Sequence, residues 1–528
     1  MSTTTVRTAT HEFLRRVGMT TVFGNPGSTE LKFFRDWPAD FNYVLGLQES
    51  CCVAMADGYA QATRRPAFVN LHSAAGVGHA LGSVYTAWRN QTPLVITAGQ
   101  QTRAMFPTEP YLYASQAAEF PKPYVKSSVE PARGEDVPGA IARAWYMALQ
   151  KPCGPVFVSI PEDDWDVPCD LVPERSVTGS IAPDPVALHA LAAALAAAKS
   201  PVLVVGAGVD QDDAWNAAIA LAERLEAPVW SAPMSGRASF PERHRLFAGF
   251  LPPVRAHIVN KLSAHDVIVV LGAPVFTYHI HTSGDFLPPS AALWLLTDDP
   301  EAAARSESGA AIRCSLRLGI EQLTALLPAT TRAPGKGRAP TAALVAAAKP
   351  GGALLMSLIR KTMPADAIVV EEAPTHRNVL REHLPIDISG GFYAGASGGL
   401  GWAAAAAVGV SLAQPGKRIV CIVGDGSVLY AIQSIWTAVQ HALPVTFVIF
   451  DNGGYSALKS FSGMLGVTGA PGHDLPGLDF VLLARGFGCE GMAVTRSNDV
   501  EPALRAAFGA AGPRLVAVRL DEGVERLY

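Results

Sequence analysis

Short apolar runs rich in β-branched residues recur along the chain, and segments of helical length separate them. A run of this kind is typical of a strand that is buried on both faces of a sheet. Strands that alternate with helices predict a parallel sheet covered by helices. In the first third of the chain we expect such strands at Thr21–Phe23, Tyr43–Leu47, Ala67–Leu71, Leu94–Ala98 and Val156–Ile160.

The same alternation continues in two further blocks, which two loop-like segments set apart. A segment with Pro and acidic residues covers 172–185, and a stretch rich in Pro, Gly and basic residues (TTRAPGKGRAPT) covers 330–341. We therefore predict three doubly wound α/β domains with parallel sheets, at residues 1–180, 186–328 and 342–528. The later strands expected are Pro201–Gly206, Val267–Gly272, Ala367–Val370, Ile419–Gly424 and Val445–Phe450.

Composition narrows the class of protein. The chain has 528 residues, of which 49% are hydrophobic and 17% charged, so it is a well-buried globular protein. A net charge of −4 gives no electrostatic reason to expect nucleic acid as a partner. No apolar run reaches the length of a membrane span, and Leu400–Ala413 is read as a buried helix. The first residues lack the apolar core of a signal peptide and the seven cysteines form no CxxC pair, so we expect a cytoplasmic protein with reduced thiols.

The second block contains Gly206-Ala207-Gly208 directly after a predicted strand. A dinucleotide fingerprint would continue to a third glycine, but Asp210 follows instead. We therefore expect this block to act as a scaffold and a pocket wall.

The stretch Ile419–Tyr455 has the strongest chemical pattern. Gly424-Asp425-Gly426 ends one strand, and Asp451-Asn452-Gly453-Gly454 ends the next. The carboxyl ends of parallel strands meet at one sheet edge, so the Asp425 and Asn452 side chains can converge on one cation. Oxygen ligands beside glycine-rich helix starts suit magnesium held against a diphosphate. Each motif taken alone is also compatible with an ordinary turn.

The pattern of GDG, then 24 residues, then Asp451-Asn452 resembles the cofactor motif of the thiamine diphosphate enzymes, although Asp451 stands where that family has a first Asn. The resemblance implies thiamine diphosphate with magnesium, the metal being held by Asp425, Asn452 and the carbonyl of Gly454. It also implies that Glu49, after the second strand, faces the cofactor's aminopyrimidine and that Leu400 supports its thiazolium ring. The remaining cofactor contacts implied are Thr375, Gly398, Gly424, Gly426, Ser427 and Tyr455.

Four further loops resemble the benzoylformate-decarboxylating members of the family: Val22–Glu30, Asn70–Gly78, Thr97–Met105 and Gly272–His279. By this resemblance Ser28 binds the substrate carboxylate, and His72 and His279 transfer protons. The implied reaction is decarboxylation of an aromatic 2-oxo acid, most simply benzoylformate to benzaldehyde, through the cofactor's ylide and an enamine. Ala457, Leu458 and Phe461 match the substrate pocket of those members, but Ala394 replaces an aromatic residue and should enlarge the cavity.

In relatives the Glu and the metal site belong to different subunits, so the resemblance also implies a homo-oligomer, most simply a tetramer. It places the activity in aromatic catabolism, in the mandelate pathway. Two alternatives stay open: a carboligating relative of the acetolactate synthase or benzaldehyde lyase type, and a catalytically silent binding subunit. Without the resemblance, Glu49 would be an ordinary first-turn helix residue. Likewise, His72 would be a loop histidine hydrogen-bonded to backbone, and His279 a surface histidine beside His281.

Overall fold

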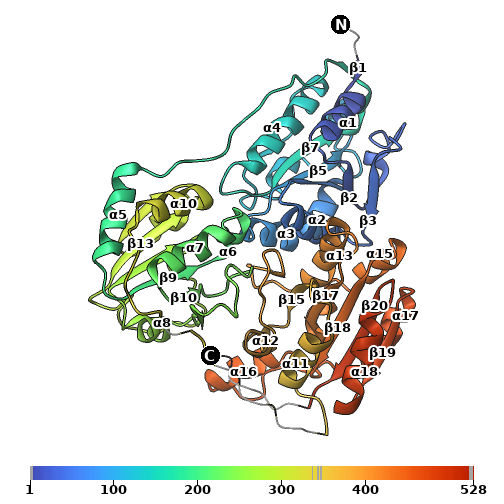
Figure 1. Cartoon of the computed structure of the whole chain (residues 1–528). Helices are drawn as coiled ribbons and strands as arrows, with labels where there is room; N and C mark the ends of the chain where they lie inside the picture. Colours follow the sequence, from blue (N-terminus) through green and yellow to red (C-terminus); the bar gives the residue numbers. More distant parts are fainter. Residues whose placement is uncertain are drawn as a thin grey trace.

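The computed structural model describes residues 4–335, 337–339, 341, 344, 348–521 and 527. Within these residues the chain forms three parallel six-stranded sheets with helices on their faces (Figure 1). The predicted fold class is therefore confirmed. The exact domain boundaries stay a prediction, and residues 1, 342 and 528, which were used to define them, lie outside the described part of the chain, as do Lys336 and Pro340 of the expected linker.

The first sheet has the strand order β3-β2-β4-β5-β7-β6, and a short antiparallel pair, β1 (Thr4–Thr5) with β8 (Pro168–Cys169), joins the ends of the domain. Its strands β4, β5 and β7 are buried throughout, as their apolar sequences predict. The elements are β2 (Thr21–Gly24), β3 (Asn42–Leu45), β4 (Ala67–Leu71), β5 (Leu94–Gln100), β6 (Ser128–Val129) and β7 (Val156–Pro161), with α1 (Val6–Arg16), α2 (Glu49–Thr63), α3 (Ser73–Arg89) and α4 (Val137–Leu149).

The middle sheet has the order β11-β10-β9-β12-β13-β14, so the chain reverses its direction of travel between β9 and β12. Figure 1 shows this domain to one side of the other two. Its elements are β9 (Pro201–Val205), β10 (Val229–Ser231), β11 (Phe247–Phe250), β12 (Val267–Leu271), β13 (Ala292–Thr297) and β14 (Ala310–Arg313), with α5 (Pro185–Ala197), α6 (Ala207–Gln211), α7 (Trp215–Leu225), α8 (Arg255–Leu262), α9 (Pro300–Ala304) and α10 (Leu316–Leu326).

The third sheet has the order β16-β15-β17-β18-β20-β19. Its strands are β15 (Ile368–Glu372), β16 (Phe392–Ala394), β17 (Ile419–Gly424), β18 (Val445–Asp451), β19 (Glu490–Val494) and β20 (Arg514–Arg519). Its helices are α11 (Gly352–Thr362), α12 (Arg377–His383), α13 (Ala403–Ala413), α14 (Asp425–Val428), α15 (Ser434–Gln440), α16 (Ser456–Met464), α17 (Phe480–Gly486) and α18 (Ser497–Phe508). No helix among the described residues combines the length and the apolar character needed to cross a bilayer.

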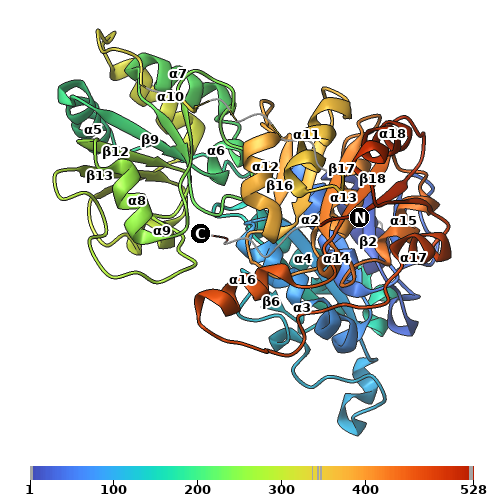
Figure 2. The ribbon, with the colours of Figure 1, turned by 90° about the horizontal axis from the view of Figure 1, so that it is seen from below.

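The first and third domains pack through α2 and α13, which lie side by side in Figure 2 and share one hydrophobic core. Glycines allow the two backbones to touch: a Cβ on Gly409 would lie 1.8 Å from the carbonyl oxygen of Met55. Asp57 crosses the same interface, because its fully buried carboxylate accepts hydrogen bonds from Gln61, Asn90, Thr92 and the indole N–H of Trp402.

Asp210 joins all three domains. Its buried carboxylate accepts hydrogen bonds from Arg237 in its own domain and from Arg64 in the first domain. From the third domain it accepts the hydroxyl of Ser389 at 2.6 Å and the amide of Gly390 at 3.0 Å. A buried carboxylate is stable only when it is paired and hydrogen-bonded, so the three domains depend on one another at this point.

Candidate active site

Asp425, Asn452 and Gly454, predicted to hold the metal and called the metal cradle below, follow the carboxyl ends of the neighbouring strands β17 and β18. Asp425 opens the short helix α14, and its buried carboxylate accepts the amide of Gly426 at 2.7 Å and the amide of Gly454 at 2.9 Å. Burial raises the pKa of Asp425, and the nearby Asp451 carboxylate raises it further, while the amide hydrogen bonds lower it. A cation at this place would stabilise the ionised carboxylate.

The Asn452 side chain provides the test of whether a metal fits. Its oxygen Oδ1 is buried and has no hydrogen-bond partner among the described residues. A buried carbonyl oxygen without a donor is costly, and a hard cation such as magnesium would satisfy it. The cradle offers a carboxylate, an amide oxygen and backbone carbonyls, which is a magnesium-type ligand set, and no group of three or more His, Cys, Asp or Glu side chains suited to a metal occurs in the described residues.

Asp451 does not share this role. Its carboxylate accepts hydrogen bonds from Arg519 at 2.8 Å and from the amide of Gly453 at 3.2 Å. Gly453 and Gly454 have φ angles of +79° and +153°, and a Cβ on Gly454 would lie 2.1 Å from the carbonyl of His473. Only glycine fits in this turn, which brings the backbone up to the Asp425 carboxylate.

The other predicted cofactor residues gather around the same sheet edge. Ser427 is buried in α14 close to Gly424, and the Tyr455 ring packs so tightly on Gly426 that a Cβ there would lie 2.4 Å from it. Thr375 lies in a short 3-10 helix (Pro374–His376) that follows β15. The structure therefore brings Thr375, Ser427 and Tyr455 to the ends of neighbouring strands, β15, β17 and β18.

Leu400 lies in a loop between two glycines with positive φ, Gly398 at +78° and Gly401 at +96°. The expected helix 400–413 begins only at Ala403, because the Glu372 carboxylate accepts the amides of Gly401, Trp402 and Ala403 at 2.6–2.8 Å. Burial raises the pKa of Glu372 to about 7. Glu372 thus fixes the loop that presents Leu400. The sequence analysis missed it, although two acidic residues at the end of a buried strand were a signal.

A second group of predicted residues lies in the first domain. His72 precedes α3, and its Nδ1 lies 2.8 Å from Oε2 of Glu30 and 3.2 Å from the Thr29 hydroxyl. Glu30 is 1% exposed and also accepts the amides of Gly27 and Gly99. The hydrogen bond to Glu30 raises the pKa of His72. His72 is therefore held in one orientation, with an exposed Ser28 at the start of the same turn.

Glu49 is the first residue of α2, behind the Gln48 N-cap. Its Oε2 lies 3.1 Å from Nδ1 of His79, and its side chain is 14% exposed. Its hydrogen-bond partner among the described residues thus belongs to its own domain, and none was found in the third domain, which carries the metal cradle.

His279 lies with the predicted substrate pocket. The His279 and Phe461 rings are 5.0 Å apart at 71°, in an edge-to-face arrangement that joins the middle domain to α16. Ala457 and Leu458 lie on the first turn of α16, and Leu458 is exposed. Three of these predicted pocket residues, Ala457, Leu458 and Phe461, therefore lie on one helix, α16.

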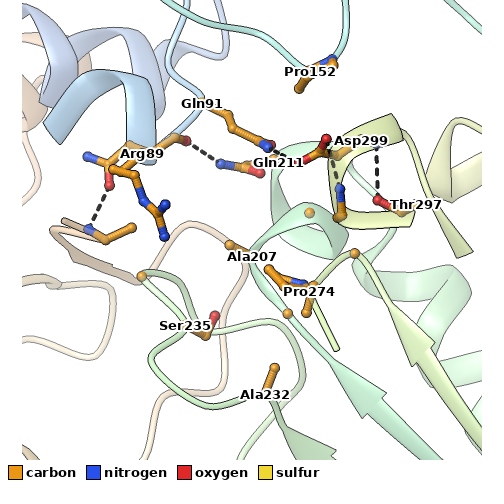
Figure 3. A pocket seen from close by; sticks show the side chains of 18 of the residues that line it. Arg89, Gln91, Pro152, Ala207, Gln211, Ala232, Ser235, Pro274, Thr297 and Asp299 are labelled. Atoms are coloured by element: carbon orange, nitrogen blue, oxygen red, sulfur yellow. Dashed lines mark hydrogen bonds between the residues drawn. The ribbon is translucent and has the colours of Figure 1, made fainter. Parts of the chain in front are cut away.

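Ala394 lies elsewhere. It is buried at the end of β16, where its amide donates to the carbonyl of Gly236, and it lines a cavity of about 260 Å³ at the junction of the three domains. Figure 3 shows this cavity between Arg89, Ala207, Ser235, Pro274 and Asp299. The structure does not group Ala394 with His279 and Phe461, and its place in the substrate pocket stays a prediction.

The same cavity lies at the carboxyl ends of β9 and β12, where the strand order reverses. This is the usual ligand position of an open α/β sheet. The glycine turn and the carboxylate that a dinucleotide would need here already make contacts within the protein. Gly208 packs on Gly272, since a Cβ there would lie 2.9 Å from its Cα. The Asp299 carboxylate caps α9 and accepts a hydrogen bond from Gln91. This geometry agrees with the interpretation of the block as a scaffold.

Comparisons with known proteins cover the whole chain. Models of thiamine pyrophosphate enzymes match the N-terminal binding domain over residues 4–118, the central domain over 188–323 and the C-terminal binding domain over 375–518. A benzoylformate decarboxylase of Pseudomonas aeruginosa is 44% identical over 97% of this chain and 98% of that protein. An acetolactate synthase large subunit of Haemophilus influenzae is 25% identical over 98% of this chain and 94% of that protein.

Two solved structures are similar along their full length. The benzoylformate decarboxylase of Polynucleobacter necessarius superimposes with a TM-score of 0.96 at 39% identity and covers 99% of both chains. The thiamine diphosphate-dependent 4-hydroxybenzoylformate decarboxylase of Rhodococcus jostii superimposes with a TM-score of 0.95 at 40% identity, over 99% of this chain and all of the other.

Proposed function

The chain belongs to the thiamine pyrophosphate enzymes, in their benzoylformate decarboxylase family, and from this premise we propose that it decarboxylates an aromatic 2-oxo acid without oxidation. The substrate proposed is benzoylformate, and the products are benzaldehyde and carbon dioxide. The observation that carries the proposal is the identity of 44% with a benzoylformate decarboxylase over nearly the full length of both chains. The cradle of Asp425 and the orphan oxygen of Asn452 support the cofactor and its metal.

Bound thiamine diphosphate supplies the nucleophilic carbon and the electron sink that this reaction needs. The residues of the chain bind and orient it. Asp425, Asn452 and the Gly454 carbonyl would hold magnesium against the diphosphate, and Leu400, fixed by Glu372, would support the thiazolium ring. Glu49 would hydrogen-bond the pyrimidine ring and control its protonation.

Proton transfer falls to the two histidines. His72 is oriented by the buried Glu30, so its Nδ1 is occupied and its Nε2 is left to face the substrate. The His279 ring packs edge-to-face on the Phe461 ring, beside the residues proposed to form the substrate pocket. Ser28 would bind the carboxylate of the substrate. An acid–base group acts best when its pKa lies near the working pH, and imidazole meets that condition.

The proposed assembly concerns the position of Glu49. Among the described residues Glu49 has a hydrogen bond only within its own domain, and we propose that a second copy of the chain brings Glu49 to the metal cradle. We place the active sites at such a dimer interface and propose a tetramer of two dimers. We also propose that the enzyme is cytoplasmic and works in aromatic catabolism, in the mandelate pathway.

The test is product analysis with purified protein, thiamine diphosphate and magnesium. Benzaldehyde from benzoylformate, with no acetolactate from pyruvate, is the expected result. Acetolactate from pyruvate would instead identify a carboligating enzyme, and bound cofactor without turnover of any 2-oxo acid would identify a silent binding subunit. The role of Glu49 is tested with Glu49→Gln, a variant that should bind the cofactor but lose most of its turnover. Unchanged turnover in that variant would remove Glu49 from its assigned role.

A further inference from the structure

Glu49 is in contact with a histidine that the proposed mechanism has not used. His79 lies in the second turn of α3, and its Nδ1 is 3.1 Å from Oε2 of Glu49. The Glu49 carboxylate is 14% exposed, whereas the His79 side chain is 63% exposed. The largely buried acid therefore has its hydrogen bond to an imidazole that solvent can reach.

The geometry of α3 explains why the two groups meet. His72 is the N-cap residue of α3 and His79 lies in its second turn, so both histidines belong to the N-terminal end of this helix. Gly76 lies between them in the sequence, and a Cβ there would come within 3.1 Å of Oε1 of Glu49. The glycine leaves room for the carboxylate, and Glu49 also raises the pKa of His72, in a smaller measure than Glu30 does. Glu30, His72, Glu49 and His79 thus form a row of alternating acids and bases.

The two oxygens of Glu49 have different surroundings. Oε2 is held by His79, while Oε1 has no hydrogen-bond partner among the described residues. A carboxylate that is held by one oxygen keeps its other oxygen in a defined direction, and this is how a second residue orients a catalytic one. The neighbouring titratable groups on α2 are the Cys51 and Cys52 thiols, which stay neutral because burial raises the pKa of Cys51 to about 12 and that of Cys52 as well.

We propose that His79 is a positioning residue for Glu49: its Nδ1–H holds Oε2 and leaves Oε1 for the ring nitrogen of the thiamine pyrimidine. The inference rests on the proposed function for the role of Glu49, but the hydrogen bond itself does not depend on it. A donor at the Nδ1 position is what matters, and the amide nitrogen of Asn reaches the same position because both atoms are bonded to the γ carbon.

The first experiment is independent of turnover. Nitrogen-15 NMR of histidine-labelled protein, with the His79 signals assigned by their loss in His79→Asn, reports which ring nitrogen carries the proton. We expect the Nδ1–H tautomer at neutral pH, and the Nε2–H tautomer that free imidazole favours once Glu49→Ala removes both carboxylate oxygens. An Nε2–H tautomer in the unaltered protein, or the same Nδ1–H tautomer in Glu49→Ala, would overturn the proposal.

The second experiment compares two substitutions in the holoenzyme. His79→Leu should lower kcat about tenfold, the effect of losing one hydrogen bond of about 1.4 kcal/mol, and leave KM for the 2-oxo acid within about twofold. His79→Asn should recover kcat to within about twofold of the original enzyme. Equal kcat in His79→Leu and the original enzyme, or an equal loss in both variants, would refute the positioning role. His189→Asn, at an exposed histidine on α5, is the control for a change of surface charge. Failure of the original enzyme to form aldehyde would refute the proposed function but leave the tautomer result standing.

Discussion

Replacing Glu30 by Gln should change the pH dependence of the enzyme, because Glu30 is hydrogen-bonded to His72. The Glu30 carboxylate accepts four hydrogen bonds: Oε1 from the Thr29 hydroxyl at 2.7 Å and the Gly99 amide at 2.9 Å, and Oε2 from the Gly27 amide and His72 Nδ1, each at 2.8 Å. A Gln side chain can keep its oxygen at the Oε1 position. Its NH₂ group then faces the Gly27 N–H, which loses its acceptor, and it can donate to His72 Nδ1 only if the imidazole takes the Nε2–H tautomer. Both hydrogen bonds to the charged Oε2 are therefore lost.

The magnitude follows from these two contacts. A hydrogen bond to a charged group contributes about 1.5 kcal/mol or more, so the free energy of unfolding should fall by about 3 kcal/mol. Loss of the negative acceptor should also lower the pKa of His72, because the hydrogen bond to Glu30 is the main cause that raises it. The limb of the pH profile of kcat/KM that reports His72 should therefore move toward acid pH.

The assay is the pH dependence of kcat/KM for aldehyde formation, together with urea unfolding of each variant. Thr29→Val is the matched control, because it removes a hydroxyl beside both Glu30 and His72 but keeps the carboxylate. The limb should move much less in that control, because the negative charge beside His72 is unchanged. If the profile of Glu30→Gln superimposes on that of the original enzyme, or if Thr29→Val shifts it as far, Glu30 does not set the behaviour of His72.

Two further predictions concern stability and the metal. His11 is buried among aromatic rings, and burial together with the charge of Arg7 lowers its pKa to about 4; the unfolded chain therefore takes up a proton first, and stability should fall by about 2 kcal/mol between pH 7 and pH 5. His11→Leu should lose this dependence in urea unfolding at the two pH values, and an equal slope in both proteins would contradict the assignment. Asn452→Leu removes the buried Oδ1 that has no partner among the described residues and should weaken apparent magnesium affinity at least about tenfold in cofactor-loading titrations. The control is Asp451→Asn, which should stay near the original affinity because the Asp451 carboxylate binds Arg519. Equal magnesium affinity in all three proteins would exclude Asn452 as a ligand.

The sequence was sufficient for ten of the strands, but it did not predict others such as the edge strands β6, β11, β14, β16 and β19. Val445–Phe450 and Ile419–Gly424 are apolar runs with polar residues at their ends, and this local pattern determines both where a strand lies and which residues follow it. The positions of Asp425 and Asn452 were predictable for the same reason, because they depend on strand ends alone, whereas their role as metal ligands stays a prediction.

The residues that the sequence analysis missed act at a distance. Glu30 and Glu372 are held by backbone amides and side chains from other segments, so only packing reveals that they orient His72 and Leu400. The start of α13 at Ala403 rather than Leu400 has the same cause, since the cap comes from another strand. His79 could have been noticed, because it lies two helical turns after His72 in the sequence.

The contacts between the domains determine whether they stay together when the chain is cut between them. The segment 172–182 runs between the first two domains largely exposed and outside any helix or strand. The domains that it connects are also joined by contacts outside the segment: Arg237 donates to Gln61 at 3.2 Å, Gln91 donates to Asp299 at 3.1 Å, and Asp210 accepts from Arg64. A protease cut within this segment should therefore leave two fragments on a denaturing gel but one particle in gel filtration. These contacts do not depend on the peptide bond between the domains, which could be broken without separating them.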